Sequence, residues 1–148
     1  MDFFRAWREP KLRQVAALPY VAGPEGVWIC LVTSRGSGRW ILPKGWPKKK
    51  LPDPDLAARE AWEEAGLSGQ IERVPIGHFV VRKRLHVFAA PRCRVDVYPL
   101  AVETQALTWP EQAQRKLMWF PASEAAETVS DKGVVPLLAE LDRYLQIE

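Results

Sequence analysis

Apolar residues along the chain follow two different spacings, which predict strands in some stretches and helices in others. Gly26–Thr33 is continuously apolar, as in a strand buried on both faces, whereas Arg94–Glu103 alternates between apolar and polar residues. Weaker patterns predict further strands at Leu12–Leu18, Trp40–Leu42, Gln70–Phe79, Val80–Phe88 and Trp119–Phe120, and turns at Arg35–Gly38 and near Arg82–Leu85.

Helical spacing occurs in three stretches. Val134–Ile147 carries leucines at the spacing of one helical face, and Ser123–Glu127 opens a shorter helix. A third helix is predicted from about Pro54 to Ala65. Strands interleaved with two or three helices fit an α/β fold in the form of an α/β/α sandwich with a mixed β-sheet.

The third helix has recognisable signals at both ends. Asp53 is predicted to be its N-cap, and Pro54 suits the first helical position, where no N–H is needed. Asp55 adds negative charge at the positive end of the helix dipole. Gly66 can adopt the left-handed conformation that closes a helix.

Three glutamates share one face of this helix, because Glu60, Glu63 and Glu64 are spaced i, i+3 and i+4. Carboxylates this close repel one another and resist ionisation. A hard divalent cation such as Mg²⁺ relieves the repulsion, since it binds several carboxylate oxygens. Taken alone, the pattern also fits a surface helix with an acidic, solvated face.

The stretch from Gly45 to Leu67 resembles the Nudix box, G-x5-E-x7-R-E-U-x-E-E-x-G-U, in which U is a bulky aliphatic residue. The matching positions are Gly45, Arg59, Glu60, Glu63, Glu64, Gly66 and Leu67. Leu51 stands where the motif has its first glutamate, and Ala61 is small for the first U position. The match crosses a predicted strand end, a loop and a helix, which makes it specific.

The resemblance implies the Nudix fold and an enzyme that hydrolyses a pyrophosphate linkage in nucleoside diphosphate derivatives or similar polyphosphates. In that family Mg²⁺ or Mn²⁺ is held by the helical glutamates, and often by the backbone carbonyl of the box glycine. Those residues are Glu60, Glu63, Glu64 and Gly45 here. One of the glutamates is expected to act as the base, and a bound ion lowers the pKa of the attacking water.

Arg59 is expected to brace the glutamates rather than to contact the substrate. In the family this arginine often pairs with the first box glutamate, a pair that Leu51 cannot form. Asp53 or Asp55 lies close enough in sequence to take its place. If neither does, Arg59 is held less well and activity falls.

Further segments resemble the diphosphoinositol polyphosphate phosphohydrolases, a Nudix subfamily that also cleaves diadenosine polyphosphates, and a bacterial branch of it in particular. They are Arg13–Ala17, Arg39–Gly45, Lys44–Pro47, Val95–Val102, Trp109–Glu111 and Arg115–Phe120. Together they cover about residues 11 to 130. The resemblance implies a small-molecule substrate that carries many phosphates.

Basic residues gather in three places although the net charge is only +3. The clusters are Lys44, Lys48, Lys49 and Lys50, then Arg82, Lys83, Arg84, Arg92 and Arg94, and finally Arg115 with Lys116. If the fold brings them to one sheet edge, they attract phosphates. The candidate substrate contacts are Arg39, Lys44, Arg82, Arg84 and Arg115. The same charge would attract a nucleic acid, which is the less favoured partner.

Glu111 is the candidate for an additional carboxylate from outside the box, because it lies in a predicted loop. Trp28, Trp62 and Trp119 are expected to be core residues. Trp46 follows the box glycine inside a lysine-rich loop. It either stacks on a base or packs beneath the loop, and the sequence leaves both open.

The composition is ordinary for one globular domain, with 47% hydrophobic and 26% charged residues, so residues 1–148 are expected to form a single domain. No apolar run approaches about 18 residues and no signal-peptide pattern is present, so a cytoplasmic protein without a membrane partner is expected. Cys30 and Cys93 lie in apolar runs and are expected to be buried free thiols.

Two classes of function remain, and neither the natural substrate nor the oligomeric state follows from the sequence. The first is a metal-dependent pyrophosphohydrolase acting on a diadenosine polyphosphate, a diphosphoinositol polyphosphate or a related nucleoside diphosphate derivative, with an enzyme acting on RNA 5′ ends as a variant. The second is a Nudix module that binds a nucleotide without turnover, which Leu51 favours. The complete set of Arg59, Glu60, Glu63 and Glu64 favours the enzyme.

Overall fold

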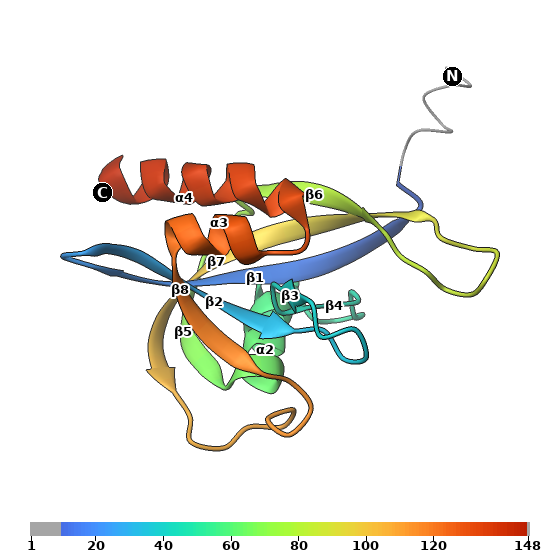
Figure 1. The fold of residues 1–148 in the computed structure, drawn as a ribbon, viewed down its shortest axis with the longest axis horizontal. Coiled ribbons are helices and arrows are strands. Elements are labelled where there is room, and N and C mark those ends of the chain that lie inside the picture. Colours follow the sequence, from blue (N-terminus) through green and yellow to red (C-terminus); the bar gives the residue numbers. More distant parts are fainter. Residues whose placement is uncertain (1–9, 148) are drawn as a thin grey trace.

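A single β-sheet lies between helices in the computed structural model, which describes residues 10–147 (Figure 1). The strands are β1 Leu12–Gly23, β2 Gly26–Thr33, β3 Trp40–Ile41, β4 Lys44–Gly45, β5 Leu67–Ile71, β6 Gly77–Arg82, β7 Arg92–Gln105 and β8 Leu117–Pro121. The helices are α2 Asp53–Ala65, α3 Ala122–Thr128, the 3₁₀ turn η1 Lys132–Val134 and α4 Val135–Ile147. No helix within the described residues is long and apolar enough to cross a membrane.

The sheet is mixed, as the sequence predicts. Its main path runs β3-β2-β1-β7-β5, while β4 pairs with β1, β6 with β7 and β8 with β2. The central pair β1 and β7 is parallel, and every other pair is antiparallel. The parallel pair is long, with partners from Leu12 opposite Cys93 to Tyr20 opposite Ala101.

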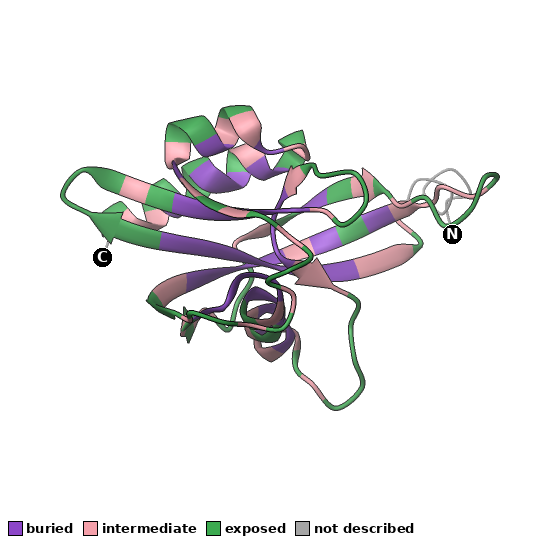
Figure 2. Ribbon diagram, turned by 60° about the horizontal axis from the view of Figure 1, so that its bottom comes forward, coloured by how far each residue is buried: buried purple, intermediate pink, exposed green. Residues whose placement is uncertain are grey.

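The two faces of the sheet carry two separate cores. Along β1, Val15 and Ala17 point to the core that contains α2, whereas Ala16 and Leu18 point to the core beneath α3 and α4. All four are fully buried, so β1 is the continuous hydrophobic run expected of a strand covered on both faces. Figure 2 shows this buried centre between the helical layers. The predicted α/β/α sandwich is therefore confirmed.

The strand boundaries after α2 differ from the prediction. The sequence predicts Gln70–Phe79 and Val80–Phe88 with a break near Arg82, but the structure has β5 ending at Ile71 and β6 spanning Gly77–Arg82. Pro75 lies in the gap between β5 and β6, and a proline cannot donate a ladder hydrogen bond. Residues 83–91 form the loop of the β6–β7 hairpin instead of a strand.

One end of α2 agrees with the prediction and the other does not. Gly66 closes the helix in the left-handed conformation, with φ 69°, as predicted. Asp53 is not the N-cap: the helix begins at Asp53 itself and Pro52 precedes it without a side-chain cap. The Asp53 carboxylate instead accepts a hydrogen bond from Arg13 Nη1 at 2.6 Å. An ion pair to β1 has therefore replaced the expected local cap.

Two tryptophans expected in the core lie near the surface, since Trp28 and Trp62 are 38% and 40% exposed. On α2 the buried positions go to small and aliphatic residues and to two glutamates, so Trp62 falls beside the core face. Trp119 is partly buried against the core on the α2 side. Cys30 and Cys93 are buried free thiols, as predicted.

Candidate functional site

The glutamates of α2 face inward. Glu60 is 8% exposed and Glu64 only 2%, whereas the Glu63 side chain, on the same face by spacing, is 34% exposed. A solvated acidic stripe would leave all three in water, so that alternative is excluded for Glu60 and Glu64. Burial of two carboxyl groups on one helix is costly and requires partners.

The backbone of β4 lies directly against these carboxyl groups. Gly45 pairs with Val15 of β1, and a Cβ atom at position 45 would overlap the Glu60 carboxyl group. The backbone N–H of Lys44 donates a hydrogen bond to Glu64 Oε2 at 3.2 Å. The lack of a side chain at Gly45 therefore allows Glu60 to lie against the strand.

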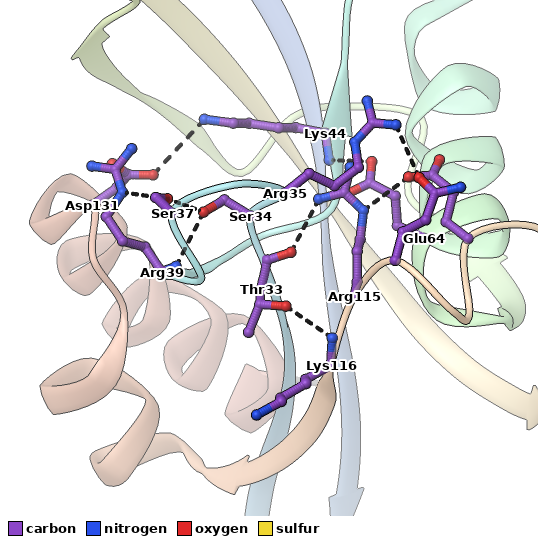
Figure 3. Close-up of polar contacts among 12 residues, drawn as sticks. Thr33, Ser34, Arg35, Ser37, Arg39, Lys44, Glu64, Arg115, Lys116 and Asp131 are labelled. Carbon is purple, nitrogen blue, oxygen red and sulfur yellow. Dashed lines mark hydrogen bonds and ion pairs between the residues drawn. The ribbon is translucent and has the colours of Figure 1, made fainter.

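Arg115 and Glu111 lie in the segment before β8, and Figure 3 shows the Arg115 side chain directed toward Glu64. Arg115 Nε donates to Glu111 Oε1 at 2.9 Å, and Arg115 Nη1 lies 3.5 Å from Glu64 Oε1. The backbone N–H of Glu111 also donates to the carbonyl of Glu63 at 2.9 Å, which fastens this segment to α2. Glu111 thus lies beside α2, and its role as an additional carboxylate stays a prediction.

These groups surround a cavity of about 380 Å³, which we call the carboxylate cavity. Its charged lining residues are Glu60, Glu64, Glu111, Arg35, Lys44, Lys48, Lys83 and Arg115, with Gly45 beside them. Glu63 and Arg59 are not among the described residues that line the cavity. The structure therefore brings six of the predicted site residues into one cavity: Lys44, Gly45, Glu60, Glu64, Glu111 and Arg115.

Two carboxyl groups of the carboxylate cavity have raised pKa values. Burial raises the pKa of Glu64 to about 9, and a hydrogen bond that its protonated carboxyl group donates to Glu60 adds to that increase. Burial also raises the pKa of Glu60, and the nearby charge of Glu63 adds to that increase. Glu64 Oε1 is buried and accepts no hydrogen bond within residues 10–147.

A divalent cation fits this donor set. Carboxylate oxygens are hard ligands, and a bound cation would favour the ionised form of two carboxyl groups that burial disfavours. Among the described residues, no three acidic, histidine or cysteine side chains already form a metal site. Glu60 and Glu64 nevertheless supply two carboxylates in one cavity, and Glu64 Oε1, which accepts no hydrogen bond within residues 10–147, is available to a ligand.

Neither Asp53 nor Asp55 takes the place of the missing glutamate beside Arg59. Asp53 binds Arg13 at 2.6 Å, and Asp55 binds Arg73 at 2.7 Å. The Arg59 side chain is 51% exposed, and its Nε lies 4.0 Å from Glu63 Oε1. The two aspartates connect α2 to β1 and to the loop after β5, and the ion pair described for the box arginine is with Glu63 of its own helix.

A second cavity of about 440 Å³, the cationic groove, adjoins the first and shares Ser34, Ile41, Lys44 and Lys83 with it. Its further basic lining residues are Arg39, Arg82 and Lys132. Lys44 Nζ lies 3.8 Å from Asp131 Oδ2, and burial lowers the pKa of Lys44. Arg84 is not among the lining residues of either cavity and donates to the carbonyl of Val87 at 3.4 Å.

The carboxylate cavity also contains Gln14, which the sequence pattern did not single out, and Trp46, whose position the sequence left open. Gln14 of β1 is 3% exposed, and its Oε1 accepts no hydrogen bond within the described residues. The signal in the sequence that could have identified Gln14 is its polar side chain directly before the apolar run of β1. Trp46 is 43% exposed and lines the cavity, with Lys83 Nζ 5.8 Å from its ring centre. Trp46 is therefore at the mouth of the site and not beneath the loop.

Comparison with known sequences gives one family. The model of the NUDIX domain matches residues 11–141. Nudix hydrolase 21, chloroplastic, of Arabidopsis thaliana is 30% identical over 117 residues, which cover 76% of this chain and 57% of that protein. Diphosphoinositol polyphosphate phosphohydrolase 2 of Rattus norvegicus is 29% identical over 124 residues, which cover 82% of this chain and 65% of that protein.

The chain spans about three fifths of the length of the curated relatives it matches. Among solved structures, a binary complex of the C. elegans Ap4A hydrolase superimposes with a TM-score of 0.67 at 16% identity. The superposition covers 93% of this chain and 99% of that one. At this identity the likeness shows a shared fold.

Proposed function

The chain belongs to the Nudix hydrolase family, and on that premise we propose that it is a metal-dependent pyrophosphohydrolase acting on a highly phosphorylated small molecule. The observation that carries the proposal is the burial of Glu60 and Glu64 in one cavity with Gly45 and Glu111. A fold that only bound nucleotides would gain nothing from two buried carboxyl groups with raised pKa values.

Glu60 and Glu64, with the backbone carbonyl of Gly45 and with Glu63 as a further carboxylate, are the proposed holders of Mg²⁺ or Mn²⁺. When bound, such an ion neutralises phosphate oxygens and lowers the pKa of the attacking water. Glu111 is the proposed acceptor of the water proton, because it lies in the cavity and is oriented by Arg115 at 2.9 Å.

The proposed substrate class is set by the cationic groove. Lys44 belongs to both cavities, and Arg39 and Arg82 extend the positive lining away from the carboxylates. A diphosphate at the carboxylates would therefore place its remaining phosphates against arginine and lysine, which bind them by charge and hydrogen bonds. Diadenosine polyphosphates and diphosphoinositol polyphosphates have this form, and the names of two similar proteins refer to such compounds.

A nucleotide-binding module without turnover is the second candidate. It is favoured by Leu51 in place of the first box glutamate and by the exposure of Arg59. The burial of Glu60 and Glu64 argues against it, since these groups are expensive to keep without a chemical use.

A turnover screen with Mg²⁺ tests the proposal. Wild-type protein and Glu64→Gln would be compared on diadenosine polyphosphates, inositol pyrophosphates, nucleotide sugars and 5′-triphosphorylated RNA. We expect turnover of the first two classes by the wild type and its loss in the variant. Binding of these compounds without turnover by the wild type would favour the binding module, and a preference for RNA would favour the 5′-end variant.

A further inference from the structure

Arg115 is the most deeply buried arginine among those whose ion pairs the structure describes, with its side chain 9% exposed. Three acceptors surround its guanidinium group. Nε binds Glu111 at 2.9 Å, Nη1 binds the carbonyl of Thr33 at 3.1 Å, and Nη1 lies 3.5 Å from Glu64 Oε1. These contacts engage Nε and Nη1, which carry three of the five N–H donors of an arginine.

The backbone around Arg115 is itself fixed. The N–H of Lys116 donates to Thr33 Oγ1 at 2.8 Å, and the N–H of Thr33 donates to the carbonyl of Lys116 at 3.0 Å. This double contact joins the start of β8 to the end of β2. The guanidinium group is therefore carried by a loop residue whose neighbour, Lys116, is anchored to the end of β2.

The arginine inside the sequence motif has the opposite surroundings. Arg59 is half exposed and lies 4.0 Å from Glu63, which is a weak contact in water. The aspartates that could have held it bind Arg13 and Arg73. Nothing described around Arg59 equals the three contacts of Arg115.

We propose that Arg115 is the positioning residue of this site, which fixes the carboxylates of Glu64 and Glu111 in place of the weakly held Arg59. The role rests on the proposed function, since those carboxylates are assigned there to the reaction. Arg115 acts through the glutamates and does not contact the substrate. Removing a partner that orients a ligand typically costs about 10- to 100-fold in activity or metal affinity.

Kinetic constants separate this role from a substrate contact. Arg115→Gln should lower kcat by about 10- to 100-fold while KM changes by less than about threefold. Arg115→Lys keeps the charge and should recover part of kcat. Arg59→Gln, the matched control, should cost less than Arg115→Gln. A rise in KM at unchanged kcat in Arg115→Gln, or a larger loss in Arg59→Gln, would overturn the proposal.

A double-variant cycle tests whether Arg115 acts through Glu111. If it does, Arg115→Gln combined with Glu111→Gln should cost little more than the larger single effect, because coupled groups are not additive. Independent, additive losses in kcat would contradict the role.

A thermal measurement needs no substrate and so remains informative if the proposed reaction fails. Without metal, Arg115→Gln leaves Glu64 and Glu111 without their positive neighbour, so its Tm should fall. Mn²⁺ should then raise the Tm of Arg115→Gln by more than that of the wild type, because the cation supplies the missing charge. A fall in Tm that Mn²⁺ does not reduce would show that Arg115 only supports the fold.

Discussion

The carboxylate cavity and the cationic groove adjoin, yet their charged groups are held in different ways. In the cavity, Glu64 is 2% exposed and is contacted by the backbone of Lys44 and by Arg115. In the groove, Lys132 donates to backbone carbonyls of α3, and the exposed Arg82 donates to the carbonyl of Ala90. The buried carboxylate of the cavity is thus fixed by contacts from two other segments, whereas Arg82 and Lys132 in the groove bind backbone carbonyls.

This difference indicates a division of labour. Bond cleavage depends on groups placed accurately before the reaction, which is what mutual contacts within the cavity provide. Affinity for a phosphate-rich molecule depends on charge that remains accessible, which the groove provides. Lys44 joins the two regions, because its N–H holds Glu64 and its side chain lies 3.8 Å from Asp131.

The largest effect is expected from neutralising a buried carboxylate. Glu64→Gln and Glu60→Gln keep the side-chain shape but remove a charged ligand, so kcat should fall by at least about 10² to 10⁴ with the fold retained. Turnover with Mg²⁺ and a thermal melt measure the two quantities. Glu124→Gln, at an exposed position of α3, is the matched control. Activity close to the wild type in both cavity variants would remove the assignment of the site.

Gly45→Ala should give the next largest effect. Its Cβ atom would overlap the Glu60 carboxyl group, so that carboxyl group must move. We expect kcat to fall by about 10-fold or more, since misplacement of about 1 Å in a site can cost 100-fold. Gly23→Ala is the control, because a Cβ there meets nothing within 4 Å. Equal activities of the two variants would show that the contact between β4 and Glu60 is unimportant.

Charge reversal in the groove should act on binding instead. Arg82→Glu removes a cation from the groove lining, and we expect KM for a tetraphosphate substrate to rise about tenfold with kcat little changed. Arg84→Glu reverses the same charge two residues away, outside both lining sets, and should raise KM less. Equal effects of the two variants would mean that only the total charge of the hairpin matters.

The smallest effect is expected at the position where the sequence departs from the motif. Leu51→Glu restores the missing glutamate, but Arg59 is not the residue that contacts the buried carboxylates. We expect kcat to change by less than about threefold. Leu51 is partly buried against the core on the α2 side, so a thermal melt measures any loss of packing separately. A large gain in turnover would indicate that Arg59 needs its partner and that the natural protein is a weakened enzyme.

The sequence predicts those parts of the molecule that depend on local pattern. The strand Gly26–Thr33 and the closure of α2 at Gly66 follow from apolar spacing and from the left-handed preference of glycine, and both are observed as predicted. The motif also identifies Gly45, Glu60 and Glu64, which the structure brings into one cavity.

Long-range pairing is what the sequence does not determine. Asp53 is a plausible cap by local rules, but a 2.6 Å contact with Arg13, 40 residues away, takes its carboxylate. From the sequence, Arg115 is predicted to be one more cation that contacts substrate phosphates. The pairing of β8 with β2 instead places it beside Glu111 and Glu64. Trp62 is expected in the core by spacing alone, and the packing of α2 on the sheet leaves it 40% exposed.

The division between the two regions is tested most directly by the selectivity of the wild-type enzyme at two salt concentrations. The ratio of kcat/KM for diadenosine tetraphosphate to that for ADP-ribose, with Mg²⁺, would be measured at low salt and near physiological ionic strength. We predict a ratio well above one that falls as salt rises, because the Debye length shortens to about 8 Å and the exposed cations of the groove are screened. A higher kcat/KM for ADP-ribose, unaffected by salt, would contradict the assignment of the cationic groove to substrate selection.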